Sequence, residues 1–302
     1  MTSEQLALCE PALHTIGCCL LHFVWQGLLV GGGLALLMAL LRKSTANTRY
    51  VVLFTGLMAM AALPLLTMTL LPPSPTAMSL AADAAGPAPS DTGNAATPAT
   101  PVVEVVAPAL AATPAPAPAA RTVDLAAWAT RVRTLLDPWL PGVASLWLLG
   151  VCLLALWNLG GWMQVRRLRV RDVTETPRPW REELDQICRR LGVSRPVRLL
   201  ESGRVAAPLV VGTLRPVILL PVAVMTGLTP DQVYAILAHE VAHIRRHDYA
   251  ANLVQTAIVT LLFYHPAVWW VSRRIREERE NYCDDLAVKS CGASLLYARA
   301  LA

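Results

Sequence analysis

The chain has 302 residues, of which 55% are hydrophobic and 16% are charged, and its mean hydropathy is +0.46. This composition excludes an ordinary soluble globular protein and indicates an integral membrane protein. The net charge of +5 is modest. The arginines cluster beside apolar segments, which indicates orientation in a membrane and no direct contact with nucleic acid.

Three segments are long and apolar enough to cross a bilayer, whose apolar core needs about 20 helical residues. They run over about residues 16–41, 50–71 and 144–164. We therefore assign residues 1–72 to two transmembrane helices and residues 136–166 to a third. This arrangement also predicts extensive contact with membrane lipid.

The first predicted span contains four residues that indicate contacts with other helices. Gly27 and Gly31 have the small-x-x-x-small spacing that lets helices approach closely. His22 and Gln26 are polar groups at membrane depth, and we expect a neighbouring helix to satisfy their hydrogen bonds.

Basic residues predict the orientation of the chain in a bacterial plasma membrane. The loop between the first two spans contains Arg42, Lys43 and Arg49, and the third span is followed by Arg166, Arg167, Arg169 and Arg171. The positive-inside rule places both groups in the cytoplasm. Residues 73–135 then lie outside, and their Ala/Pro-rich composition predicts a disordered extracytoplasmic loop.

Residues 167–302 have the pattern of a small α+β domain, which is cytoplasmic by the same argument. An amphipathic helix is expected over Trp180 to Leu191. Short apolar runs predict strands at residues 197–200, 208–212 and 216–221. The last of these strands is a candidate to pair with an extended substrate.

A helix begins at the capping-box sequence Thr229-Pro230-Asp231-Gln232 and carries an H-E-x-x-H motif at residues 239–243. His239 and His243 share one helix face, so their imidazoles can bind one zinc ion. Glu240 can take a proton from a water on that ion. The alternative is a surface helix with two solvated histidines.

The third ligand must come from elsewhere, and Glu280 is the best candidate. Asp284 lies one turn further along the same predicted helix and can orient a ligand histidine. Other candidate ligands are Glu277, Glu278, His265 and Cys283. The alternative is that residues 273–285 form a solvated, charged helix face without a metal.

The apolar segment from Ala251 to Val271 is long enough to cross a membrane. A crossing would put Glu280 on the opposite side from His239, and one zinc ion cannot bridge that distance. We therefore expect the segment to bend at His265-Pro266 into a membrane-associated helical hairpin. The alternative is an ordinary fourth span, without Glu280 as a ligand.

Five motifs together resemble a known family. They are Pro216 to Pro221, His239 to His243, Arg246 with Asp248, His265-Pro266 with Trp269, and Glu280 with Cys283 and Asp284. This series resembles the BlaR/MecR-type membrane metallopeptidases, the beta-lactam sensor-transducers. The resemblance implies zinc bound by His239, His243 and Glu280, with Glu240 as general base and Asp284 orienting a ligand. In sensor members a penicillin-binding domain follows a further span, which would lie beyond Ala302.

The fold predicted from these features is an α-helical integral membrane protein with a small α+β gluzincin-like zinc peptidase domain. The predicted function is zinc-dependent endopeptidase activity in regulatory or signal-transducing proteolysis. Its substrate would be a protein or peptide, such as a cytoplasmic repressor or the chain itself. For the oxyanion donor, the candidates are Tyr282, His247 and Arg246. Two alternatives are a non-catalytic signal transducer with a structural zinc, and a protease of the HtpX or CAAX-processing type.

Overall fold

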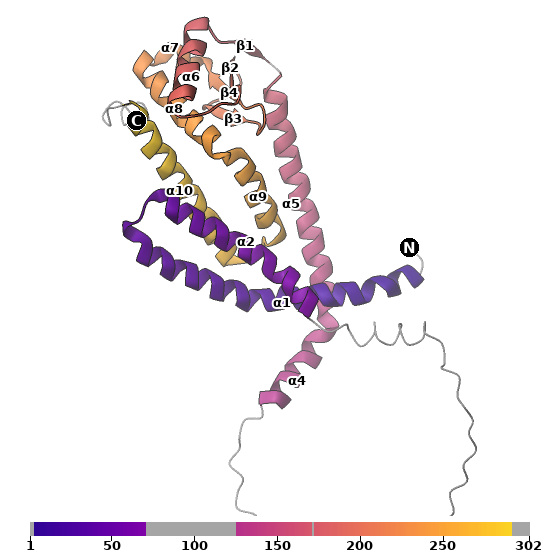
Figure 1. Cartoon of the computed structure of the whole chain (residues 1–302). Helices are drawn as coiled ribbons and strands as arrows, with labels where there is room; N and C mark the ends of the chain where they lie inside the picture. Colours follow the sequence, from indigo (N-terminus) through magenta and orange to yellow (C-terminus); the bar gives the residue numbers. More distant parts are fainter. Residues whose placement is uncertain (1–2, 71–124, 171, 292–302) are drawn as a thin grey trace, which may run out of the picture. The chain divides into compact units, whose positions relative to one another are not determined.

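The computed structural model describes residues 3–70, 125–170 and 172–291 (Figure 1). The chain divides into two compact units, residues 1–18 with 71–144 and residues 19–70 with 145–302. The second unit contains the sheet and the H-E-x-x-H helix. Most of the predicted extracytoplasmic loop, residues 73–124, lies outside the described residues.

Long apolar helices account for most of the first 170 residues. They are α1 (Ser3–Leu40), which continues into η1 (Leu41–Lys43), α2 (Ala46–Leu70), α4 (Leu125–Leu136), η2 (Asp137–Trp139) and α5 (Leu140–Leu168). Within the described residues, three stretches are long and apolar enough to span a membrane: Glu10–Lys43, Ala46–Leu70 and Thr130–Leu168. The prediction of three spans is confirmed by the length and the composition of these helices.

One segment of the first unit differs from its prediction. Residues 125–135 were expected to belong to a disordered loop, but they form helix α4. The prediction from composition was wrong here because alanine also has a high helix propensity. Residues 125–136 contain no proline, so this stretch can form a helix. In the same unit, His14 Nε2 lies 3.5 Å from Asp137 Oδ1.

The sheet has four short strands, β1 (Val173–Glu175), β2 (Arg198–Ser202), β3 (Leu209–Val211) and β4 (Val217–Pro221), in the order β1-β2-β4-β3. Strand β4 pairs in parallel with β2 and antiparallel with β3, whereas β1 pairs antiparallel with β2. The three predicted strands are confirmed, and β1 is additional. Since β4 has neighbours on both sides, β3 is the edge strand next to it.

Helices α6 (Arg178–Arg190), α7 (Val222–Gly227) and α8 (Pro230–Arg246) complete the small domain. Thr229 and Gln232 form the predicted capping box at the start of α8. The apolar face of α8 and that of α6 are buried in one cluster with Leu199, Ile218 and Leu220 of the sheet. This cluster fixes α8 against the sheet. The face of α8 that carries the two histidines does not belong to the cluster and contributes to the candidate site.

The apolar segment after α8 forms a hairpin, as predicted. Helix α9 (Asp248–Leu261) ends before His265, and α10 (Pro266–Cys291) runs back alongside α2 (Figure 1). Proline at the first position of α10 costs no hydrogen bond there. The buried apolar residues of the hairpin share one core cluster with residues of α1 and α2: Phe23, Leu34, Leu53, Leu57, Met60, Ile258, Leu262, Val268, Val271 and Ile275.

The polar and small residues of α1 contact these neighbours. A Cβ added at Gly27 would lie 2.6 Å from the Nε2 atom of His265, and one at Gly31 would lie 2.6 Å from the Cβ of Ala267. The predicted close approach is therefore confirmed, with the hairpin tip as the partner. Gln26 bonds to Thr67 of α2 as expected. His22 differs, because its Nδ1 atom accepts from Trp25 of its own helix.

Candidate active site

His239, Glu240 and His243 of the H-E-x-x-H motif line a cavity beside α8. The Nε2 atoms of His239 and His243 are 3.1 Å apart, and their ring centroids are separated by 4.8 Å. Both imidazoles are half-buried. The spacing of four residues places them one helical turn apart, so the predicted shared face is what brings them together.

The return of α10 brings Glu280 to the same point. Its Oε2 atom lies 3.5 Å from His239 Nε2 and 3.6 Å from His243 Nε2. These three side chains form a group that could hold a metal ion. The structure thus brings together the three residues that the sequence singled out as ligands.

The other candidates for the third ligand have different partners. Glu277 forms ion pairs with Arg273 and Arg274 on the outer face of α10, which lower the pKa of its carboxyl against the opposing effect of burial. Glu278 pairs with an arginine of α2. His265 contacts the backbone carbonyl of Val24. Cys283 lies on the far side of His243, 3.3 Å from its Nδ1 atom.

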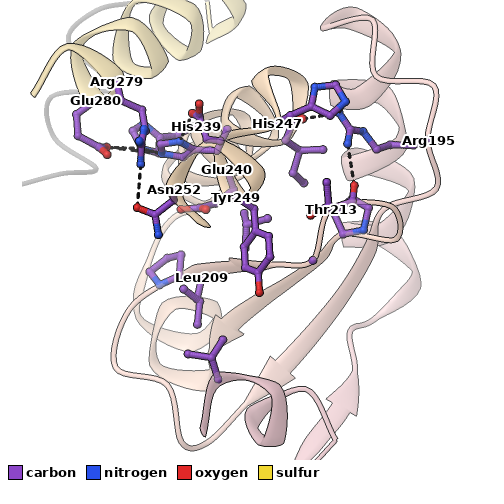
Figure 2. A pocket seen from close by; sticks show the side chains of 18 residues that line it. Arg195, Leu209, Thr213, His239, Glu240, His247, Tyr249, Asn252, Arg279 and Glu280 are labelled. Carbon is purple, nitrogen blue, oxygen red and sulfur yellow. Dashed lines mark hydrogen bonds and ion pairs between the residues drawn. The ribbon is translucent and has the colours of Figure 1, made fainter. Parts of the chain in front are cut away.

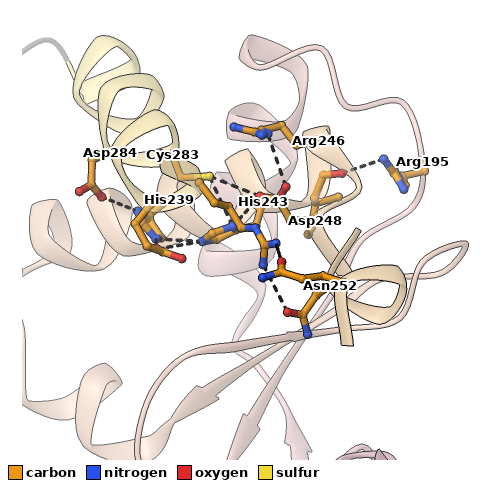
Figure 3. Close-up of polar contacts among 12 residues, drawn as sticks. Arg195, His239, His243, Arg246, Asp248, Asn252, Cys283 and Asp284 are labelled. Carbon is orange, nitrogen blue, oxygen red and sulfur yellow. Dashed lines mark hydrogen bonds and ion pairs between the residues drawn. The ribbon is translucent and has the colours of Figure 1, made fainter. Parts of the chain in front are cut away.

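Each ligand imidazole meets a carboxylate at its other nitrogen (Figure 3). Asp284 Oδ1 lies 3.1 Å from His239 Nδ1, and Asp248 Oδ2 lies 2.8 Å from His243 Nδ1. A carboxylate only accepts hydrogen bonds, so the Nδ1 atom of each ring is the donor in these contacts and the Nε2 atom faces Glu280. This is how carboxylates orient metal-binding histidines in proteins.

Asp248 is a site residue that the sequence analysis did not assign. It occurs with Arg246 in one of the quoted motifs, but nothing in the pattern pairs it with His243. The pairing depends on His247, which ends α8 with a left-handed φ of 61° and turns the chain into α9. Asp248 is then the first residue of α9 and points back at the preceding helix.

The donor set fits a divalent cation. Two ligand atoms held about 2.0–2.1 Å from a tetrahedral zinc are about 3.3–3.4 Å apart, close to the observed separations of 3.1, 3.5 and 3.6 Å. Two imidazole nitrogens and a carboxylate oxygen that converge at this separation suit a shared positive charge, either a proton or a metal cation. The four carboxylates in and around the cavity outnumber the three arginines: Glu240, Glu280, Asp248 and Asp284 against Arg195, Arg246 and Arg279.

The electrostatics of the group agree with this excess of negative charge. Burial lowers the pKa of His243, but hydrogen bonds to Asp248, Cys283 and Glu280 outweigh it and raise the pKa to about 12. Hydrogen bonds from both histidines hold the pKa of Glu280 well below its usual range. The site therefore stabilises positive charge at its centre.

Glu240 lines the cavity in front of this group (Figure 2). Burial raises the pKa of its carboxyl above the usual range; the two imidazoles oppose this shift and Glu280 adds to it. A carboxyl group whose pKa is raised toward neutrality is a better proton acceptor, and afterwards a usable donor. The position and the environment of Glu240 both suit proton transfer.

The cavity has a volume of about 450 Å³ and opens between the sheet and helices α8, α9 and α10. One wall is the edge strand β3, through Leu209 and Val210. We expected β4 to present the free edge, and that prediction is wrong, because β4 is hydrogen-bonded on both sides. The strand next to the ligand group with an unpaired edge is β3.

A second unpredicted residue in the cavity wall is Arg279, which is 6% exposed. Its Nη2 atom donates to Gln255 Oε1 over 2.6 Å, and its Nη1 atom lies 3.4 Å from Asn252 Oδ1. Among the described residues, its Nε atom has no hydrogen-bond partner. Arg279 is thus a buried cation held by two neutral amides, directly before Glu280 in the chain.

The three candidate oxyanion donors lie elsewhere or have other partners. Arg246 and Tyr282 contact each other away from the cavity lining. His247 lines the cavity, but its Nε2 atom is 2.8 Å from the guanidinium of Arg195. Arg195 of the lining is bonded to Thr213, Ile244 and His247, whereas Arg279 is bonded to two neutral amides.

Comparisons with known proteins show which family the chain is similar to. Residues 36–301 match the protein family described as BlaR1 peptidase M56. The chain is 24% identical over 152 residues to the regulatory protein BlaR1 of Bacillus licheniformis, a match that covers 50% of the chain and 25% of that protein. It is also 24% identical over 88 residues to the methicillin resistance mecR1 proteins of Staphylococcus aureus and Staphylococcus epidermidis, covering 29% of the chain and 15% of each relative.

The chain therefore spans about a quarter or less of the length of these curated relatives. The resemblance drawn from the five sequence motifs is confirmed at the level of the family, since the match includes every one of those motifs.

Proposed function

Because the chain belongs to the BlaR1 peptidase M56 family of membrane metallopeptidases, we propose that it is a zinc-dependent endopeptidase. The observation that carries the proposal is the convergence of three ligand atoms, from His239, His243 and Glu280, beside Glu240 in an open cavity. A structural zinc site is normally closed by four protein ligands, whereas this group leaves one position free.

In this proposal the two histidines and Glu280 hold the metal, and Asp284 and Asp248 orient the two imidazoles. A zinc ion there would polarise the scissile carbonyl and acidify the attacking water. Glu240 takes the proton from that water on a carboxylate oxygen and later gives it to the leaving amine. The raised pKa of Glu240 supports both steps.

Arg279 is the group we propose to stabilise the negative charge that develops on the carbonyl oxygen. Arg279 lines the cavity, and the amides of Asn252 and Gln255 already fix its guanidinium in place. A preorganised cation in a buried site stabilises developing charge strongly, because little reorganisation is needed. The neutral partners leave its charge available for the substrate.

The substrate class that we propose is an extended segment of protein. An unpaired strand edge can hold a peptide by backbone hydrogen bonds, and β3 offers such an edge along the cavity. The names of the relatives describe a regulatory protein and a methicillin resistance protein. On that ground we propose regulatory proteolysis, acting on a cytoplasmic repressor or on the chain itself.

For the membrane we propose the topology expected from the arginines. Residues 1–72 form two spans, residues 73–135 lie outside the cell, residues 136–166 form the third span, and residues 167–302 form the cytoplasmic peptidase domain. The hairpin lies beside the spans at the level of the membrane. Its shared core with α1 and α2 supports this, as do the exposed apolar side chains of Leu253, Leu261 and Trp269.

The substitution Glu240→Gln tests the proposed reaction. We expect the variant of the full chain in detergent micelles to lose at least about 100-fold in its rate of cleavage, because the proton acceptor is removed. Cleavage is measured with fluorogenic casein and by fragmentation of the chain itself, and zinc content by elemental analysis. Zinc should stay bound, since Glu240 is not a ligand.

Glu277→Gln is the matched control, because it removes a carboxyl from the outer face of α10, where Glu277 pairs with Arg273 and Arg274. It should cleave like the wild type. Wild-type rates in the Glu240→Gln variant would overturn the mechanism, and a wild type without zinc would overturn the metallopeptidase assignment for this site.

A further inference from the structure

The guanidinium of Arg246, in the last turn of α8, is enclosed by two tyrosine rings. Its Cζ atom lies 3.9 Å from the ring centroid of Tyr50 on α2 and 4.4 Å from that of Tyr282 on α10. The Arg246 side chain is 9% exposed. A desolvated guanidinium over an aromatic face is attracted by the electron-rich ring. A residue of α2 therefore holds the end of the H-E-x-x-H helix.

Arg246 is in turn connected to the ligand group. Its Nε atom lies 3.4 Å from Asp248 Oδ1, and Asp248 Oδ2 lies 2.8 Å from His243 Nδ1 (Figure 3). The Asp248 side chain is 5% exposed, so its charge depends on these neighbours rather than on water. A continuous set of contacts runs from Tyr50 through Arg246 and Asp248 to His243.

A second contact joins the same turn of α2 to α10. Arg49 Nη2 lies 2.7 Å from Glu278 Oε2, and its Nη1 atom donates to the carbonyl of Ser44 over 2.7 Å. The Arg49 and Glu278 side chains are 20% and 11% exposed. Glu278 is two residues before Glu280 in one helix. The ion pair therefore fixes the segment of α10 that presents the third ligand.

The position of Arg246 depends strongly on the two rings. Within the described residues, its Nη1 atom and the Oδ1 atom of Asp248 have no hydrogen-bond partner. The aromatic faces thus supply contacts that hydrogen bonds would otherwise provide. Without the ring of Tyr50, the cation would have space to move away from Asp248, and Asp248 would lose the charge that holds its carboxylate against His243.

We propose that Tyr50 and Arg49 are positioning residues of the metal site. Through them a helix with the properties of a membrane span sets the orientation of the His243 imidazole and of the Glu280 carboxylate. A shift of α2 against α8 and α10 would weaken metal binding, which makes the first turn of α2 a control point for the peptidase. This inference rests on the proposed function, because it assumes that the group binds zinc.

The first test compares three substitutions in α2 of the full chain in detergent micelles. Tyr50→Leu removes the aromatic face, Tyr50→Phe keeps it, and Leu57→Ala opens a buried site in the same helix away from Arg246. Zinc affinity is measured by competition with a chelator. The visible absorption of the Co²⁺-loaded protein reports the ligand geometry, which a purely structural loss in α2 would not change.

For Tyr50→Leu we expect an approximately 10-fold loss of zinc affinity and a shifted Co²⁺ spectrum, the usual effect of disturbing groups that orient metal ligands. Tyr50→Phe should retain the affinity and the spectrum of the wild type. Leu57→Ala should lower the unfolding temperature and leave both metal readouts unchanged. If Tyr50→Leu binds zinc and Co²⁺ like Leu57→Ala does, the inference is overturned.

The second test exchanges the charges of the ion pair and stays informative if Tyr50→Leu does not fold. Arg49→Glu and Glu278→Arg should each weaken zinc binding, and the double variant should recover most of the affinity. Additive losses in the double variant would contradict the positioning role of Arg49. Failure of the proposed function looks different, because the wild type itself would then bind no zinc or cleave nothing.

Discussion

At the scale of single residues, the least expected feature is a buried guanidinium that pairs with no carboxylate within the described part of the chain. Arg279 is bonded to the amides of Gln255 and Asn252, and among the described residues its buried Nε atom has no hydrogen-bond partner. Burying a cation costs free energy that neutral partners offset only in part. A substrate oxygen that gains negative charge during the reaction would supply the missing partner, so this cost is recovered in the transition state.

The substitution Arg279→Gln tests that role. We expect kcat to fall by about 100- to 1,000-fold, the usual effect of losing an oxyanion donor, while KM changes little. Zinc content should stay at the wild-type level, because Arg279 is not a ligand. Arg276→Gln is the control, since Arg276 lies one turn earlier on α10 and bonds to Ser272 outside the cavity. Equal kcat values for the two variants would rule out the assignment.

The sequence was sufficient for the residues whose geometry is local. His239, Glu240 and His243 follow from helical spacing alone, and Glu280 with Asp284 from the same spacing on a second helix. It was not sufficient for Asp248 and Arg279. The pairing of Asp248 depends on the left-handed backbone of His247, and the direction of Arg279 depends on how α10 is rotated against α9. Neither is encoded in a short pattern.

At the scale of secondary-structure elements, the hairpin of α9 and α10 has the largest consequence for the site. It could be predicted because a complete ligand set required the chain to turn back. The order of the strands could not, since alternation of side chains identifies a strand but not its neighbours. Strand β4 follows β3 in the chain, yet it lies between β2 and β3, which leaves β3 at the edge.

The tip of the hairpin depends on the glycines of α1. A Cβ atom added at Gly27 would lie 2.6 Å from the His265 ring. We therefore expect Gly27→Ala to destabilise the protein by about 1–3 kcal/mol, because the packed neighbours are forced apart. Gly33→Ala is the matched control, since nothing lies within 4 Å of a Cβ there. The unfolding temperatures of the two variants are measured in detergent. An equal decrease for Gly27→Ala and Gly33→Ala would show that close packing at Gly27 is not the cause.

At the scale of the whole molecule, the candidate metal group joins two helices of the second unit. His239 and His243 belong to α8, which packs on the sheet, whereas Glu280 belongs to α10, which packs on both α2 and α8. A metal ion shared by both helices therefore acts as a cross-link. Binding to the folded state alone stabilises a protein in proportion to the logarithm of ligand concentration.

Removal of the metal should consequently lower stability. We expect a chelator to reduce the free energy of unfolding by about 3–4 kcal/mol relative to zinc at 100 to 1,000 times its dissociation constant. Glu280→Ala should lose the response to zinc, and Glu277→Ala should keep it, because Glu277 pairs with arginines on the outer face of α10. Unfolding temperatures with and without zinc measure this. A response to zinc that survives in Glu280→Ala would assign the third ligand to another residue.

The reversal of the chain at His265 also determines when the candidate metal group can first be complete during biosynthesis. Two ligands and the proton acceptor are already present when α8 has been made, but Glu280 belongs to the helix that is synthesised after the turn. Until α10 has folded back along α2, the growing chain carries an incomplete site. Under the proposed function, activity is therefore delayed until the helices that α10 packs against are in place, and an unfinished chain lacks the group that we propose to bind the metal.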